Sequence, residues 1–455
     1  MSVRTSEHLA PDAVLKLARL KDALSALAFY GTLVIIGGML LLILAIIKAK
    51  TLYANHEGEW LIAYSIFVTT FELTRVLAAT LYRNSVNKIM RHADYISAKQ
   101  QAAYEPLVTF VVPCKNEGAD IENTVRKCFQ ADYPEEKLDV IVINDGSTDN
   151  TGVVLRKLKR QFKQRLTVVT WRKNRGKRHG MAEGFRRAKG EVIIQLDSDS
   201  YIEPSTFRNL VTPFVHPEIA AVCAHADPTN ADKNILTKMQ AAYYFMSFRI
   251  LKAAESVFMT VSCCSGCSSA YRKSATLPVM DEWLNETFLG QPVTWGDDRA
   301  LTNWLIKTGH KTIYTDLAQA YTICPDNVRQ FVKQQTRWKK SWIINAVFLA
   351  KFIIRKRPFL AITYFYPLLL VSLLTPFAAA RAMIFNPALR GVLPFYYLFG
   401  ALLLTAIILV FYRFTARDNK HWPYLFAWSA LNVVFMSFIL FYAAATIQNR
   451  KWGTR

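Results

Sequence analysis

Acidic residues are scarce in this 455-residue chain, because 34 Asp and Glu stand against 56 Lys and Arg, a formal net charge of +22. Charged residues of both signs make up only 20% of the chain, whereas 52% of the residues are hydrophobic. This composition excludes a disordered chain, a collagen and a small disulfide-stabilised scaffold. A chain this apolar and this basic is typical of a membrane protein whose cations lie on the cytoplasmic side.

Cysteine is also rare, and its pattern excludes a common kind of metal site. The cysteines show none of the spacings typical of zinc ligands, and all of them fall in one central region. We expect that region to lie in the cytosol, so the thiols are predicted to be reduced. The seven are Cys114, Cys128, Cys223, Cys263, Cys264, Cys267 and Cys324.

Two long apolar runs near the N-terminus predict membrane spans. Residues 23–47 carry no charge, and at about 1.5 Å per residue they can cross a hydrocarbon core of about 30 Å. The run is too long for a signal-peptide core, and no convincing cleavage site follows it. The second run, about 60–81, contains Glu72 and Arg75 on neighbouring helical faces. These two charges either pair with each other or line a polar path through the membrane.

Three more charge-free runs follow the central region, at 358–380, 391–412 and 422–449. Cations flank the last run at both ends, so either it is re-entrant or the positive-inside rule fails at one end. Residues 339–357 mix apolar and basic side chains. This mixture indicates either a helix in the membrane interface or a cytosolic helix packed on the central domain.

The central region alternates strand-like with helix-like segments, which predicts a mostly parallel α/β sheet. The predicted strands are 107–112, 138–144, 166–170, 191–196 and 219–224, and the first two predicted helices are 119–129 and 150–162. Ligands bind such sheets at the carboxyl ends of the strands. The polar motifs of this chain fall at those ends.

Paired acids after the fourth predicted strand are the sharpest local signal. Asp197 and Asp199, two residues apart on an irregular strand end, are placed to converge on Mg²⁺ or Mn²⁺ and leave open positions for diphosphate oxygens. A solvated turn is the alternative. Asp145, within an Asn-Asp-Gly-Ser run, either belongs to a plain turn or accepts hydrogen bonds from a nucleobase or ribose.

Two later motifs carry candidate chemistry. Asp297 and Asp298 in GDDR indicate a general base, or two acids at a helix N-terminus. In QQTRW, Arg337 suits a diphosphate leaving group and Trp338 a sugar ring, with an amphipathic interfacial helix as the alternative. The NRGKR segment places a glycine among cations that could hold a nucleotide diphosphate, and no nucleic-acid-binding module is visible.

Taken in order, VVPCKNEG, NDGSTD, NRGKR, LDSDS, GDDR and QQTRW resemble the processive family 2 glycosyltransferases with a GT-A fold, which include cellulose, chitin and hyaluronan synthases. Residues 285–303, the longer QQTRWKKSW and the C-terminal WGTR look most like hyaluronan synthases. The resemblance covers the chain from Leu107 to its C-terminus. It departs at Cys267, where Pro is usual, at Asn144, where Asp is common, and in the run after Ser341.

The resemblance implies an inverting transfer that joins UDP-GlcA and UDP-GlcNAc into hyaluronan, with secretion through the protein's own helices. A chitin-like synthase that uses one UDP-sugar is the alternative. The implied roles are catalysis for Asp298 with Asp297, UDP binding for Asp145, Lys177, Arg178, Asp197, Arg337, Trp452 and Arg455, metal binding for Asp199 with Asp197, and acceptor binding for Gln334, Trp338 and Cys267.

The predicted organisation is a GT-A domain inserted between transmembrane helices of a multi-pass plasma-membrane protein, with the catalytic domain in the cytosol. Its parts are a cytosolic segment (1–22), two transmembrane helices (23–82), the catalytic domain (104–341), an interfacial helix (342–357), transmembrane or re-entrant helices (358–449) and the WGTR motif (450–455). The predicted partners are both UDP-sugars, the nascent polysaccharide and membrane lipid, but no nucleic acid.

Overall fold

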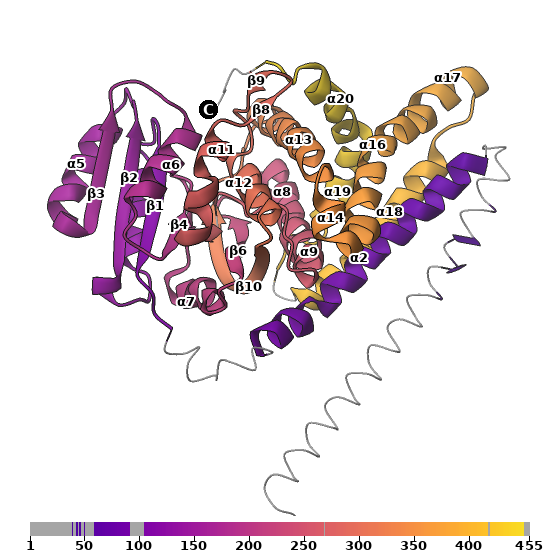
Figure 1. Cartoon of the computed structure of the whole chain (residues 1–455). Coiled ribbons are helices and arrows are strands. Elements are labelled where there is room, and N and C mark those ends of the chain that lie inside the picture. The colour runs from indigo at the N-terminus through magenta and orange to yellow at the C-terminus, as the bar shows by residue number, and fades with distance from the viewer. Residues whose placement is uncertain are drawn as a thin grey trace, which may run out of the picture. The chain divides into compact units, whose positions relative to one another are not determined.

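A computed structural model describes residues 39, 42–43, 45–46, 50, 59–91, 104–267, 269–416 and 419–449 (Figure 1). Most of the predicted span 23–47 and all of the WGTR segment lie outside the described residues. The chain divides into two compact units, Met1–Leu77 and Ala78–Arg455.

A long helix, α2 (Glu59–Arg91), carries the first candidate membrane span in the described part of the chain, Trp60–Tyr82. Within this span Arg75 Nη1 donates to Glu72 Oε1 at 2.8 Å and to Oε2 at 3.1 Å. The Arg75 guanidinium also lies 5.4 Å from the ring centre of Phe71. Of the two alternatives for these charges, the ion pair is the one observed.

The second unit contains an eight-stranded sheet in the order β3-β2-β1-β4-β7-β6-β10-β5. Figure 1 shows β3, β2, β1 and β4 side by side. β1 pairs in parallel with β2 and β4, and β6 with β10, whereas β7 is antiparallel to both of its neighbours. The strands are β1 (Val108–Cys114), β2 (Leu138–Asp145), β3 (Leu166–Trp171), β4 (Val192–Gln195), β5 (Tyr201–Ile202), β6 (Ile219–Pro228), β7 (Ser269–Arg272) and β10 (Lys311–Thr322).

The predicted mostly parallel α/β sheet is confirmed. All residues of β1 and β4 are buried, as expected for strands that read as continuous apolar runs. The helices of this domain are α4 (Ile121–Phe129), α5 (Thr151–Phe162), α6 (Lys177–Arg187), α7 (Phe207–Val211), α8 (Ile235–Met246), α9 (Ala253–Val257), α10 (Lys273–Thr276), α11 (Met280–Leu284) and α12 (Asp297–Lys307). A small hairpin, β8 (Thr287–Phe288) with β9 (Gln291–Pro292), precedes α12.

The segment before the C-terminal spans forms one long helix, α13 (Val328–Ala350), followed by α14 (Ile353–Lys356). α13 packs on α12, because a Cβ added at Gly296 would lie 1.8 Å from Ser341 Oγ, and Asn303 Nδ2 donates to Asn345 Oδ1 at 3.1 Å. The predicted helix at 339–357 is therefore the second half of α13 with α14, and it packs on the catalytic domain. Its contact with a membrane interface stays a prediction.

Three further helical stretches are long and apolar enough to cross a bilayer, and they correspond to the three predicted runs. They are Pro358–Arg390 (α15 Pro358–Leu360, α16 Tyr366–Ala380 and α17 Asn386–Arg390), Tyr397–Thr415 (within α18 Phe395–Thr415) and Tyr424–Ala445 (α19 Tyr424–Leu431 and α20 Ser437–Ala445). Aromatic contacts join these helices to the catalytic domain. The ring centres of Phe245 and Tyr412 are 3.6 Å apart, and the ring centres of Tyr243 and Trp428 are 4.2 Å apart.

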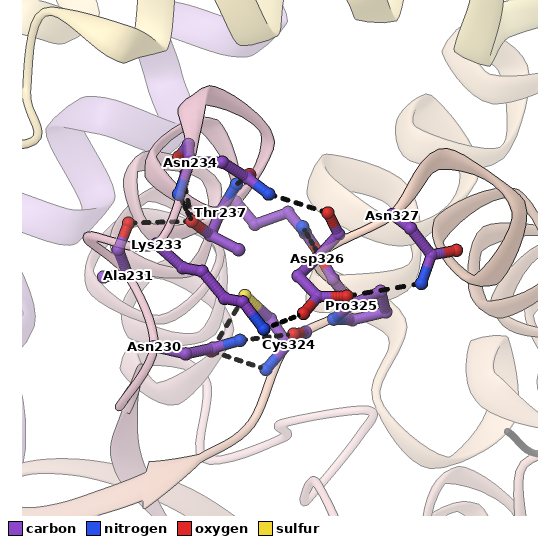
Figure 2. Close-up of polar contacts among 10 residues, drawn as sticks. Asn230, Ala231, Lys233, Asn234, Thr237, Cys324, Pro325, Asp326 and Asn327 are labelled. Atoms are coloured by element: carbon purple, nitrogen blue, oxygen red, sulfur yellow. Dashed lines mark hydrogen bonds and ion pairs between the residues drawn. The ribbon is translucent and has the colours of Figure 1, made fainter.

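The starts of α8 and α13 are tied together by polar side chains that point toward one another (Figure 2). Asn234 caps α8 by accepting from Thr237 N at 3.0 Å, and its amide donates to the Asp326 carbonyl at 2.7 Å. Asn230 exchanges two hydrogen bonds with the backbone of Cys324, at 2.8 and 3.0 Å. Because α8 and α13 both carry side chains of the site described next, this network fixes their relative placement.

Candidate active site

Nine of the residues singled out in the sequence line one cavity of about 370 Å³ in the second unit. The cavity lies where the carboxyl end of β4 meets the first turn of α12 and the middle of α13. These nine are Lys177, Asp197, Asp199, Cys267, Asp297, Asp298, Gln334, Arg337 and Trp338. Asp145 and Arg178 do not line the cavity, and Trp452 and Arg455 lie outside the described residues.

Asp197 follows the buried strand β4 and is held from three directions. Its backbone amide donates to the Gly266 carbonyl at 3.1 Å, and its Oδ1 accepts from Lys177 Nζ and, at 3.4 Å, from Gln195 Nε2. Burial opposes the charged form of Lys177, but Asp197 and Asp298 raise the pKa of this lysine above its ordinary value. Lys177 is therefore a fixed cation at the cavity wall.

Asp298 stands in the first turn of α12, after Gly296 with its left-handed backbone (φ 70°). Its Oδ2 accepts from Gly266 N at 2.9 Å, and its Oδ1 accepts from Arg299 N at 2.8 Å. The backbone of one residue, Gly266, thus contacts both Asp197 and Asp298. A Cβ at Gly266 would lie 3.0 Å from Asp197 Oδ1, so a larger residue here would crowd the Asp197 carboxylate.

Arg178 and Asp297 form a buried ion pair, with 3.0 Å between Nε and Oδ1. Arg178 Nη1 also donates to the Trp283 carbonyl at 2.9 Å and to Glu286 Oε2 at 3.3 Å. Burial raises the pKa of Glu286, although Arg178 opposes the rise. Arg178 is 5% exposed, and its guanidinium contacts these groups and does not line the cavity. This arrangement fixes the turn that presents Asp298.

Asp145, the last residue of β2, has both carboxylate oxygens occupied by the NRGKR loop. Oδ1 accepts from Arg175 N at 2.6 Å and Oδ2 from Gly176 N at 2.8 Å. Gly176 adopts φ 96°, a conformation that favours glycine. Asp145 therefore holds the loop that leads into Lys177, and its predicted contact with a nucleotide stays a prediction.

α13 presents residues of the QQTRW motif to the cavity. Gln334, Arg337, Trp338 and Ser341 lie at positions i, i+3, i+4 and i+7, which share one helical face, and Gln335, Lys339 and Trp342 extend the lining around the helix. The Trp338 ring centre lies 6.5 Å from that of Tyr244. The cavity wall therefore combines an indole with the guanidinium of Arg337, one helical turn from Gln334.

Several lining residues were missed in the sequence. Tyr244 and Phe248 come from α8 and the π-helical turn after it, Ser247–Lys252. Trp428, Asn432 and Met436 come from the last candidate membrane span. Their spacing of four residues places them on one face, and the polar Asn432 within an apolar run was the available signal.

Comparisons with known proteins agree with this geometry. The profile of glycosyl transferase family 2 matches residues 109–277. Hyaluronan synthase from Streptococcus pyogenes is 31% identical over 357 residues, which are 76% of this chain and 83% of that protein. An N-acetylglucosaminyltransferase from Azorhizobium caulinodans is 29% identical over 394 residues, which are 83% of this chain and 96% of that protein.

The solved structure of mannosyltransferase PcManGT from Pyrobaculum calidifontis, in complex with GDP-Man and Mn²⁺, superposes with a TM-score of 0.56 and 22% sequence identity. The superposition covers 85% of this chain and 99% of that one, and it supports the fold. The predicted GT-A fold and glycosyltransferase class are confirmed. The chain belongs to glycosyltransferase family 2 and is a homologue of the hyaluronan synthases.

Proposed function

We propose that this protein is an inverting, processive synthase that joins UDP-GlcA and UDP-GlcNAc alternately into hyaluronan and exports the chain through its own helices. The observation that carries the proposal is the lining of one cavity. It combines Asp298 and Lys177 of the catalytic domain, the Trp338 platform, and Trp428 and Asn432 of a candidate membrane span. A growing polymer at Trp338 would thus already touch a spanning helix.

The transfer is a single displacement. Asp298 takes the proton of the acceptor hydroxyl, whose oxygen bonds to the anomeric carbon while the bond from that carbon to UDP breaks. Inversion follows because one displacement occurs. Lys177 and Arg337 supply positive charge for the leaving diphosphate. Gln334 and Cys267 lie at the same cavity and would contact the acceptor sugar.

A divalent cation, Mg²⁺ or Mn²⁺, suits the donor set at the β4 end. Asp199 lines the cavity, and Asp197, whose Oδ1 is bound by Lys177, keeps Oδ2 as a further oxygen donor. Among the described residues no cluster of three His, Cys, Asp or Glu side chains is placed to hold a metal ion. Two carboxylates would leave positions for diphosphate oxygens and water, as hard cations prefer. When bound, the cation would supply charge neutralisation for the diphosphate.

We further propose that the protein crosses the plasma membrane several times, with the catalytic domain in the cytosol, where UDP-sugars are made. The charge-free runs and the abundance of cations between them support this orientation.

The test is product formation by the purified full-length protein in lipid nanodiscs with Mg²⁺ or Mn²⁺. UDP-GlcA and UDP-GlcNAc are supplied singly and together, and the product is digested with hyaluronidase or chitinase. We expect long product only from the pair, with complete digestion by hyaluronidase. Product from UDP-GlcNAc alone that chitinase degrades would replace this proposal with the chitin-like alternative.

A further inference from the structure

Two basic residues of the cavity wall differ from the other lining cations in their contacts. Arg299 of α12 and Lys339 of α13 both line the cavity. Within the part of the chain that the structure describes, no hydrogen bond or ion pair engages either side-chain cation. By contrast, Lys177 pairs with Asp197, and Lys252 donates to the Cys263 carbonyl. The two unpaired cations are therefore an exception among the cavity's basic residues.

Such an arrangement costs free energy in the absence of a ligand. Desolvating a cation is unfavourable unless an anion or hydrogen-bond acceptors compensate. Burial, and then the charge of Arg299, lower the pKa of Lys339. The charge of Arg299 thus disfavours the charged form of Lys339, whereas Glu255 and Asp298 favour the charged form of Arg299. An anion bound beside both cations would therefore stabilise Lys339 in particular.

The diphosphate of the UDP-sugar is not the anion that Arg299 and Lys339 would bind. The diphosphate would be balanced by Lys177, Arg337 and the divalent cation. Asp297 is already paired with Arg178, and Asp298 is held by backbone amides. Arg299 directly follows the proposed base, and Lys339 directly follows the Trp338 platform. Both cations therefore lie beside the acceptor end of the cavity.

We propose that Arg299 and Lys339 form a carboxylate-binding subsite for a uronic acid at the acceptor end of the growing chain. The inference rests on the proposed function, because the uronate comes from UDP-GlcA. The subsite is engaged when the acceptor sugar on Trp338 is GlcA, which is the step that adds GlcNAc. The other step, in which a GlcNAc-ended chain accepts GlcA, does not require it.

The experiment measures the two half-reactions separately with the full-length protein in nanodiscs. One uses oligosaccharides ending in GlcA with UDP-GlcNAc, and the other uses oligosaccharides ending in GlcNAc with UDP-GlcA. For Lys339→Gln we expect the acceptor KM of the first reaction to rise about 10- to 100-fold, the range for losing a charge-assisted hydrogen bond. The second reaction should change less than threefold. Lys339→Arg should restore most of the affinity, because it keeps the charge.

Calorimetry of UDP binding shows whether the Lys339→Gln protein is folded. If it is not, a second experiment that uses only wild-type protein still tests the inference. Wild-type protein is given GlcA-ended acceptor whose carboxyl has been reduced, so that it ends in glucose. We expect its KM to rise about as much as Lys339→Gln raises the KM of the natural acceptor. Equal KM values for natural and reduced acceptors would overturn the subsite while the proposed function stands. Impairment confined to GlcA transfer would place the cations at the donor sugar and also overturn it. Failure of the wild type to extend any GlcA-ended acceptor would overturn both.

Discussion

Arg178 and Asp297, which are 119 positions apart in the sequence, meet in a buried ion pair with 3.0 Å between Nε and Oδ1. This pair couples the NRGKR loop to the turn that presents Asp298. The resemblance implies that Arg178 contacts UDP and that Asp297 shares in catalysis, and both roles stay predictions. Both residues are buried, and Arg178 compensates the charge of Asp297 and also that of the buried Glu286.

We therefore expect Arg178→Met to lower the free energy of unfolding by about 3–5 kcal/mol, because it leaves a buried carboxylate uncompensated. Transfer should fall with it, since the Asp298 turn loses its anchor. UDP affinity, measured by calorimetry below the unfolding temperature, should change little. Lys177→Met is the matched control, and it should weaken UDP binding instead. An Arg178→Met protein of wild-type stability that no longer binds UDP would establish the nucleotide contact as the residue's role.

The second prediction separates the two acids of GDDR. Asp298→Asn should retain UDP-sugar binding but lower kcat by about 10²–10⁴-fold, the usual contribution of a general base. Asp297→Asn is its neighbouring control. That change should act mainly on stability, because Asp297 Oδ1 is engaged by Arg178. The measurements are the UDP release rate and the thermal midpoint of each variant. Similar kcat losses with similar destabilisation would assign both acids a purely structural role.

The third prediction concerns the metal. Chelation with EDTA and the substitution Asp199→Asn should each abolish UDP release, and added Mn²⁺ or Mg²⁺ should rescue only the chelated protein. Asp199 is the test residue because Asp197 Oδ1 also binds Lys177, so changing Asp197 would disturb two contacts. Binding of Mn²⁺ in the presence of UDP, followed by electron paramagnetic resonance, checks the assignment without catalysis. Unchanged UDP release after both treatments would refute it.

The fourth prediction uses the link between α8 and α13. Asn234→Ala should cost about 0.5–2 kcal/mol of stability as a lost N-cap. It should also raise the acceptor KM, because the lost bond to the Asp326 carbonyl frees the start of the helix that carries Trp338. Asn327→Ala is the matched control, since Asn327 caps α13 by accepting from Gln330 N at 3.0 Å but is exposed. An equal rise in KM for both variants would show that the link has no special role.

The strands and their polar ends were predictable because the signals are local. Buried β-branched runs such as 138–144 form strands wherever they are covered on both faces, and Asp197 and Asp199 follow such a run directly. Asp298 and Trp338, from later motifs, line the same cavity as these acids. That convergence was implied by the family resemblance and not by any single spacing.

Long-range partners were not predictable, because nothing near Arg178 in the sequence identifies Asp297 or Glu286 as its contacts. The antiparallel insertion of β7 between β4 and β6 was missed for the same reason, since strand pairing depends on tertiary context. Tyr244 was missed because an apolar aromatic helix such as α8 gives the same pattern whether it covers a sheet or lines a cavity.

The last prediction tests the charge on Lys339 through pH. Burial and the charge of Arg299 lower its pKa below the ordinary value of 10.5, so its ammonium is lost at a lower pH than that of an ordinary lysine. The other charged groups that line the same cavity are Lys177, Asp197, Asp199, Lys252, Asp297, Asp298, Arg299 and Arg337. A uronate carboxylate stays ionised at neutral and alkaline pH. The pH dependence of the affinity for a GlcA-ended acceptor should therefore follow the protonation of Lys339.

The acceptor KM for GlcA-ended oligosaccharides should therefore rise between pH 7 and 10, and the carboxyl-reduced acceptor should show a flat profile over the same range. Lys339→Arg should remove the rise, because a guanidinium keeps its charge throughout. Initial rates at each pH, with UDP-GlcNAc saturating, give the two profiles. A rise that persists in Lys339→Arg would assign the titration to another group in the cavity.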